Sequence, residues 1–142
     1  MSVMLMASLR PDAVLAQGAG ADDGRIVVEL NNAADTETGA CRLTFVAANH
    51  SDTGFEAASW QVGVFDAQGI VRSILVLEFG ALAQRRTRIV LFDLPGRPCA
   101  DISRVVVNDV AACRVQGGGA AMSDVCLDAL TPRSRTDIAF DL

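Results

Sequence analysis

Lysine and tyrosine are both absent from this 142-residue chain, and histidine and tryptophan occur once each. All 12 basic side chains are therefore arginines, and the 17 aspartates and glutamates outnumber them, which leaves a formal net charge of −5. A protein that binds nucleic acid needs a net basic face to neutralise phosphates. The acidic balance therefore argues against a nucleic-acid partner.

A long hydrophobic run is also missing: no stretch of about 18 uncharged apolar residues occurs, and we predict no transmembrane span in the mature chain. The N-terminus has only a short apolar stretch, Val3 to Leu9, and small residues before Gln17 that suit cleavage after Ala16 by a signal peptidase. We expect residues 1–23 to be a degenerate signal or leader segment and residues 24–142 to form one domain. The alternative is a disordered leader on a cytosolic protein.

The four cysteines lack the Cys-x-x-Cys spacing of zinc sites and of thioredoxin-like redox motifs. An even number of cysteines in a small domain favours structural disulfides, which persist in oxidising compartments such as the bacterial periplasm. We therefore predict two disulfides and a periplasmic or secreted protein, with four buried free thiols as the alternative. The cysteines are Cys41, Cys99, Cys113 and Cys126.

From Arg25 onward, apolar and polar residues alternate over short runs bounded by turn residues, which is typical of β-strands. We expect the last two strands to be joined by a hairpin at Asn108-Asp109, a pair that tolerates the positive φ of a tight turn. A short helix should follow, capped by Ser123 and ended by Pro132. The predicted strands are 25–30, 41–47, 59–64, 70–79, 85–94, 102–107 and 110–115.

About seven short strands without intervening helices predict an all-β fold, a single antiparallel β-sandwich of the immunoglobulin-like type. In that topology the second and sixth strands lie in opposite sheets, and their ends could bring Cys41 and Cys99 together. Of the three possible connectivities we therefore favour Cys41–Cys99 with Cys113–Cys126. Trp60 corresponds to the core tryptophan of immunoglobulin domains, whereas the lack of tyrosine excludes their tyrosine corner.

Short segments spread along the mature chain carry a further pattern. They are Val28-Glu29-Leu30-Asn31, Cys41-Arg42-Leu43, Val64-Phe65-Asp66, Phe92-Asp93-Leu94, Cys99 with Ile102, Val107-Asn108, Cys113, Cys126-Leu127-Asp128 and Ser134-Arg135. With these segments the chain resembles a group of small exported bacterial proteins of unassigned activity, often labelled only as proteins with a Tat-type signal sequence. The resemblance implies export and paired cysteines and brings no catalytic residue with it. No arginine pair precedes the apolar run, so the export route stays open.

Residues suited to catalysis are scarce in this sequence. His50 is the only candidate base for a Ser-His-Asp triad, and its neighbour Ser51 does not help because residues adjacent in sequence do not form a triad. The sequence has no nucleophile elbow, phosphate loop, dinucleotide fingerprint or His-Glu-x-x-His pair, and its aspartates do not match a calcium loop. We therefore expect a protein that is not an enzyme and has no metal site and no cofactor.

One cluster of basic residues, Arg85, Arg86 and Arg88, lies on the predicted fifth strand. Alternation places Arg86 and Arg88 on its solvent face and turns Ile89 and Leu91 toward the core. Exposed arginines often mark an interface, because the guanidinium group binds a carboxylate through two hydrogen bonds. The competing interpretation is that these charges protect an edge strand from aggregation.

Together these features predict a non-catalytic interaction or accessory module whose partner is another protein of the cell envelope. The alternative is a small hydrolase or a metal carrier with an unrecognised site. A pocket that brought His50 together with acids or thiols would favour that alternative.

Overall fold

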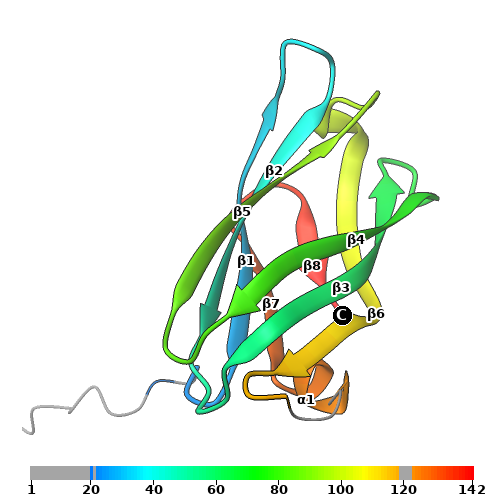
Figure 1. The fold of residues 1–142 in the computed structure, drawn as a ribbon. Helices are drawn as coiled ribbons and strands as arrows, with labels where there is room; N and C mark the ends of the chain where they lie inside the picture. Colours follow the sequence, from blue (N-terminus) through cyan, green and yellow to red (C-terminus); the bar gives the residue numbers. More distant parts are fainter. Residues whose placement is uncertain (1–19, 21, 119–122) are drawn as a thin grey trace, which may run out of the picture.

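The computed structural model describes residue 20, residues 22–118 and residues 123–142, and it consists of two packed four-stranded β-sheets (Figure 1). The first sheet has the order β5-β2-β1-β7, with β1 at Ile26–Asp35, β2 at Cys41–Asn49, β5 at Thr87–Leu94 and β7 at Leu130–Ser134. The second has the order β4-β3-β6-β8, with β3 at Phe55–Asp66, β4 at Val71–Leu82, β6 at Ile102–Val115 and β8 at Ala139–Asp141. The predicted all-β sandwich is confirmed.

Two short helices complete the described elements, a 3-10 helix η1 at Cys99–Asp101 and an α-helix α1 at Ser123–Asp128. Neither could reach across a bilayer, and no other helix in the described residues is long and apolar enough to do so.

The C-terminal part departs from a purely antiparallel sandwich, because β7 pairs in parallel with β1 and β8 pairs in parallel with β6. The expected helix ends earlier than predicted, at Asp128, and Pro132 lies inside the edge strand β7 instead of stopping a helix. The side chain of Arg25 secures this arrangement. Its guanidinium donates hydrogen bonds to the carbonyl oxygens of Asp128 and Leu130 at 2.6 and 2.8 Å.

The predicted hairpin at Asn108-Asp109 is wrong, because Ile102 to Val115 form one strand that follows β3 along its length. The register of this pairing shifts at Asn108, whose Nδ2 donates to Gln61 Oε1 at 2.6 Å. A β-bulge takes up one extra residue and keeps the ladder intact on both sides. The two predicted strands therefore form the single strand β6, which pairs with β3 along its length. Because β7 and β8 are not among the predicted strands, the described chain has eight strands instead of seven.

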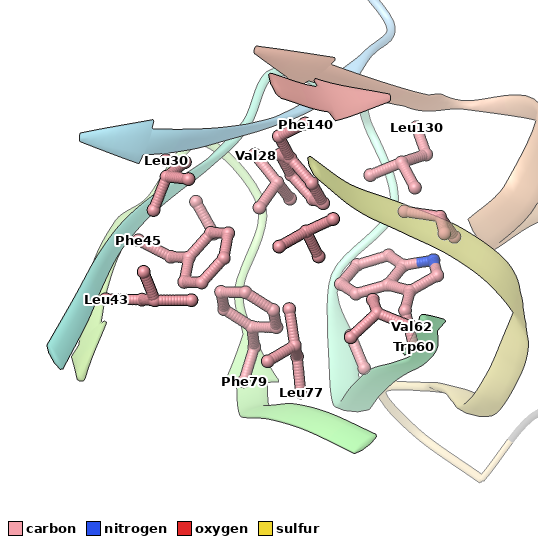
Figure 2. Packing of buried hydrophobic residues seen from close by; sticks show 14 of the residues in the cluster. Val28, Leu30, Leu43, Phe45, Trp60, Val62, Leu77, Phe79, Leu130 and Phe140 are labelled. Carbon is pink, nitrogen blue, oxygen red and sulfur yellow. The ribbon is translucent and has the colours of Figure 1, made fainter. Parts of the chain in front are cut away.

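Alternate residues of both sheets point into one shared core (Figure 2). The ring of Phe45 on β2 packs edge-to-face against Phe79 on β4, with centroids 6.1 Å apart, and Trp60 on β3 contacts the same Phe79 at 5.5 Å. Phe140 on β8 lies 5.2 Å from Phe45, so the last strand completes the core. Each such aromatic pair stabilises the fold by about 0.5–1.5 kcal/mol beyond its buried area.

Both predicted disulfides are confirmed. Cys41, the first residue of β2, is joined to Cys99 in η1, and Cys113 of β6 is joined to Cys126 of α1. Since β2 and the β6 that follows η1 belong to opposite sheets, the first bond ties the two sheets together. Disulfides of this kind persist in oxidising surroundings, and they point to an extracytoplasmic environment.

Candidate interaction surface

Strand β5 lies at the edge of the first sheet and pairs only with β2 in the part of the chain that the structure describes. The ladder runs from Ala48 opposite Thr87 to Cys41 opposite Leu94. Along the other edge of β5, no strand of the described residues pairs with its backbone groups. Such an edge is a template on which a further strand can pair.

The side chains of β5 alternate in the opposite sense to the prediction. Phe92 faces the core, where its ring lies 5.8 Å from Phe45 and 5.9 Å from Phe79. Ile89 and Leu91, which we expected to point inward, are 67% and 57% exposed. Ile89 to Phe92 are four successive apolar residues, so the sequence pattern allows either set of alternate residues to face the core. The core contacts of the Phe92 ring favour the set that contains Phe92, since a large aromatic side chain gains more from burial than Leu91 would.

Arg85, the first member of the predicted cluster, serves the structure of the neighbouring loops. It adopts a left-handed backbone conformation with φ of 61° in the turn between β4 and β5. Its guanidinium donates to Asp52 Oδ1 at 2.7 Å and to the His50 carbonyl oxygen at 2.9 Å, and Asp23 lies at 3.4 Å. The hydrogen bond to Asp52 contributes most to raising the pKa of Arg85. This arginine is therefore largely engaged within the chain.

Arg86, just before β5, and Arg88, its second residue, are both exposed. They border a shallow recess of about 350 Å³ where β4 ends and β5 begins, which we call the arginine recess. Arg88 donates to the Ala81 carbonyl oxygen at 3.1 Å. By alternation Arg88 lies on the same side of β5 as Phe92, but it is exposed because that side is open at the start of the strand. The recess is lined by Ala81, Leu82, Ala83, Arg86, Thr87 and Arg88.

No acidic side chain lines the arginine recess, and neither of its arginines forms an ion pair within the described residues. Most other arginines differ. Arg42, Arg72, Arg85, Arg104, Arg114, Arg133 and Arg135 each form an ion pair with an aspartate or a glutamate. Arg97 has no ion pair with any residue that the structure describes, but it lines a pocket together with Asp66 and Asp101. Two neighbouring uncompensated guanidinium groups on a protein of net charge −5 form a local site for an anion.

Two other surface features stand out. A cleft of about 730 Å³ with a mixed polar and apolar lining lies between β1, η1 and the loop before β8, and two of its polar side chains, Asn31 and Arg135, are hydrogen-bonded to Glu29. On the second sheet, β4 and the residue just before it expose a row of aliphatic side chains near the half-buried Phe65. They are Ile70, Val71, Ile74 and Val76.

The structure does not bring His50 into a catalytic arrangement with its neighbour. The hydroxyl of Ser51 donates to Asn49 Oδ1 at 2.6 Å, and this bond supports the loop after β2. All four thiols are taken up in disulfides. No group of three or more potential metal-ligating side chains occurs in the described part of the chain.

Comparisons with known proteins give a likeness of fold. No protein-family model and no curated protein matches the chain. The structure of IrmA from Escherichia coli superposes with a TM-score of 0.59 and 14% sequence identity, over 76% of this chain and 90% of that one. At this identity the comparison shows a likeness of fold alone.

Proposed function

We propose that this protein is a non-catalytic interaction or accessory module of the bacterial cell envelope, periplasmic or secreted, that binds another envelope protein. The observation that carries the proposal is the pair of uncompensated arginines, Arg86 and Arg88, beside the exposed aliphatic residues Ile89 and Leu91. Arginines next to aliphatic side chains on an unpaired strand edge offer charge, hydrophobic area and backbone hydrogen bonds together.

Export is supported by three independent features. Two disulfides suit an oxidising compartment. The leader segment 1–23 has an apolar stretch and a small-residue cleavage site. The segments quoted above resemble small exported bacterial proteins with a Tat-type signal.

An immunoglobulin-like arrangement of the sandwich is part of the proposal. Cys41 opens β2 and is joined to Cys99 just ahead of β6, and these two strands belong to opposite sheets. Trp60, on the third strand, is a buried core residue, as in immunoglobulin domains. Folds of this class often present strand edges and loops to partner proteins.

Site-specific crosslinking in the cell envelope tests this function. A photo-crosslinking side chain in place of Ile89 should yield a discrete product with one partner, whereas the same side chain in place of Ile74 on β4 should not. Arg86→Glu with Arg88→Glu should remove the product and leave the melting temperature nearly unchanged, because exposed substitutions usually change stability by less than about 0.5 kcal/mol. As a control, Arg114→Glu reverses a single charge on β6 and should leave the crosslinked product intact.

Edge protection by the arginines predicts a different result. In that case the crosslinked product survives the two arginine-to-glutamate exchanges, and leucines in place of both arginines make the protein aggregate. This outcome would overturn the proposed interaction surface.

A further inference from the structure

The arginine recess and the free edge of β5 together define the chemistry of the segment that would bind there. We propose that β5 accepts an extended, acidic segment of the partner protein as an additional antiparallel strand, and that the arginine recess binds its carboxylates. This inference rests on the proposed function and names the class of ligand for the same surface.

The outer edge of β5 is suited to pairing with an added strand. Its ladder to β2 runs from Thr87 to Leu94 without a register shift, so no bulge interrupts the donors and acceptors on its outer edge. No proline interrupts β5, and no described strand lies along that edge. An extended peptide gains affinity on such an edge from main-chain hydrogen bonds.

The exposed side chains of β5 indicate which ligand positions should be apolar. Ile89 and Leu91 project from the outer face at alternate positions. Opposite residues on an added strand project from the same face and lie within contact distance. Two apolar residues at alternate positions of the ligand would therefore cover Ile89 and Leu91.

The arginine recess indicates the charge of the ligand. By alternation Arg88 lies on the opposite side of β5 from Ile89, and Arg86, in the turn just before β5, lines the same recess as Arg88. The ligand residues that face them must balance two positive charges, because the recess has no acid of its own. A carboxylate suits a guanidinium group best, since two parallel hydrogen bonds join them.

The three requirements fix a sequence pattern. In an antiparallel strand, the ligand residues opposite Leu91 and Ile89 come first and the residues opposite Arg88 and Arg86 follow. The pattern is apolar, any residue, apolar, acid, any residue, acid. Antiparallel pairing is the orientation that β5 already has with β2, and it is the commoner one in proteins.

Peptide binding to the full-length oxidised protein tests the inference. The probe is a blocked peptide with the core sequence Val-Thr-Val-Glu-Thr-Glu. We expect saturable binding that weakens with added salt, and a loss of affinity of about tenfold or more when both glutamates are replaced by glutamine. The same core in reverse order should bind more weakly.

Variants of the protein assign the binding to the proposed surface. Arg86→Glu with Arg88→Glu should abolish peptide binding, and Arg86→Gln with Arg88→Gln should weaken it about tenfold. The matched control Arg114→Glu should leave the affinity within about twofold. The melting temperature of each variant shows whether it is folded.

Backbone pairing is tested separately from side-chain binding. Two peptides carry N-methyl groups on alternate amides, one on the odd and one on the even positions. Only one of the two sets faces β5, so only one peptide should lose its affinity, and hydrogen exchange at amides of Thr87 to Asp93 should slow when the unmodified peptide binds.

The failures of the two proposals are distinguishable. If the glutamine peptide binds as well as the glutamate peptide, or if both methylated peptides bind, the acidic-strand inference is overturned while crosslinking at position 89 still supports an interaction surface. If the arginine variants change neither peptide binding nor crosslinking, both proposals are overturned.

Discussion

At the scale of single residues, Asp66 shows how one carboxylate organises a turn. It is buried at the end of β3 and accepts hydrogen bonds from the backbone N–H groups of Gln68 and Ile70, both at 2.9 Å, and from Arg72 Nε at 2.6 Å. The hydrogen bond from Ile70 contributes most to lowering the pKa of Asp66, followed by that from Arg72. The ionised carboxylate therefore stabilises the β3–β4 hairpin.

This assignment predicts a pH-dependent effect of Asp66→Asn. A lowered pKa in the folded state means that the ionised form contributes stability above the pKa of an unfolded aspartate, and that this contribution is lost as the pH falls through the folded pKa. The variant should have a lower melting temperature than the natural protein at neutral pH, and the difference should shrink in acid. Thermal unfolding followed by circular dichroism at several pH values measures it.

Asp93→Asn provides a control for this measurement. Asp93 is paired with Arg42 on the surface, and within the described structure its carboxylate accepts no hydrogen bond from a backbone N–H group. Exposed ion pairs contribute little to stability. A loss as large as that of Asp66→Asn would contradict the special role of Asp66.

At the scale of elements, β5 illustrates why an apolar strand is ambiguous. Ile89 to Phe92 are four apolar residues in a row, and a shift of one residue exchanges the inner and outer faces. In the folded protein Phe92 packs against Phe45 and Phe79, which leaves Leu91 outside. The same alternation places Arg88, which lines the arginine recess, on the side of β5 that faces the core further along the strand.

The register of β5 predicts unequal effects of neighbouring substitutions. Phe92→Ala removes a half-buried ring from the core cluster and should lower the free energy of unfolding by about 2–3 kcal/mol, somewhat less than for a fully buried ring. Leu91→Ser changes an exposed side chain and should cost less than about 0.5 kcal/mol. Urea denaturation compares the two variants, and the reverse order would show that the strand is shifted by one residue.

At the scale of the whole molecule, the two disulfides join parts that are distant in the sequence. Cys41–Cys99 closes the longer loop, with a separation of 58 residues, and Cys113–Cys126 spans 13 residues. A cross-link restricts the unfolded chain more when its loop is longer. The bond between the two sheets should therefore stabilise the protein more than the bond that holds α1.

Removal of each disulfide tests this order. Cys41→Ala with Cys99→Ala should lower the free energy of unfolding by about 4 kcal/mol, and Cys113→Ala with Cys126→Ala by about 3 kcal/mol. The measurement is urea denaturation of the oxidised proteins. Free-thiol labelling of the unfolded, unreduced natural protein is the control, and any labelled cysteine would contradict complete pairing.

Export is the second prediction at this scale. The proposed cleavage after Ala16 concerns residues 1–16, which lie outside the described residues. The protein recovered from a periplasmic fraction should have an intact mass that lacks Met1 to Ala16, and Ala16→Asp should prevent the cleavage because the peptidase requires a small residue there. A natural protein that retains Met1 in that fraction would contradict the prediction.

The sequence by itself determined the strands β1 to β5, the pairing of the cysteines and the position of the basic cluster, whereas it divided β6 in two and did not predict β7 and β8. These features depend on local alternation, on residue type and on the direction of strands in a sandwich. Alternation identifies a strand even when its partner is unknown. The position of Cys41 at a strand start and of Cys99 just before another strand was enough to pair them once the two strands were placed in opposite sheets.

Only the tertiary structure decided the features that depend on a neighbour distant in the sequence. Asn108 forms a bulge and not a turn because β3 pairs on both sides of it. Phe92 faces inward because Phe45 and Phe79 lie there. Arg85 is paired with Asp52 because the fold brings that loop beside it, whereas no acid of the described residues pairs with Arg86 or Arg88. The local sequence does not show which charged residues will lie close together in the folded protein.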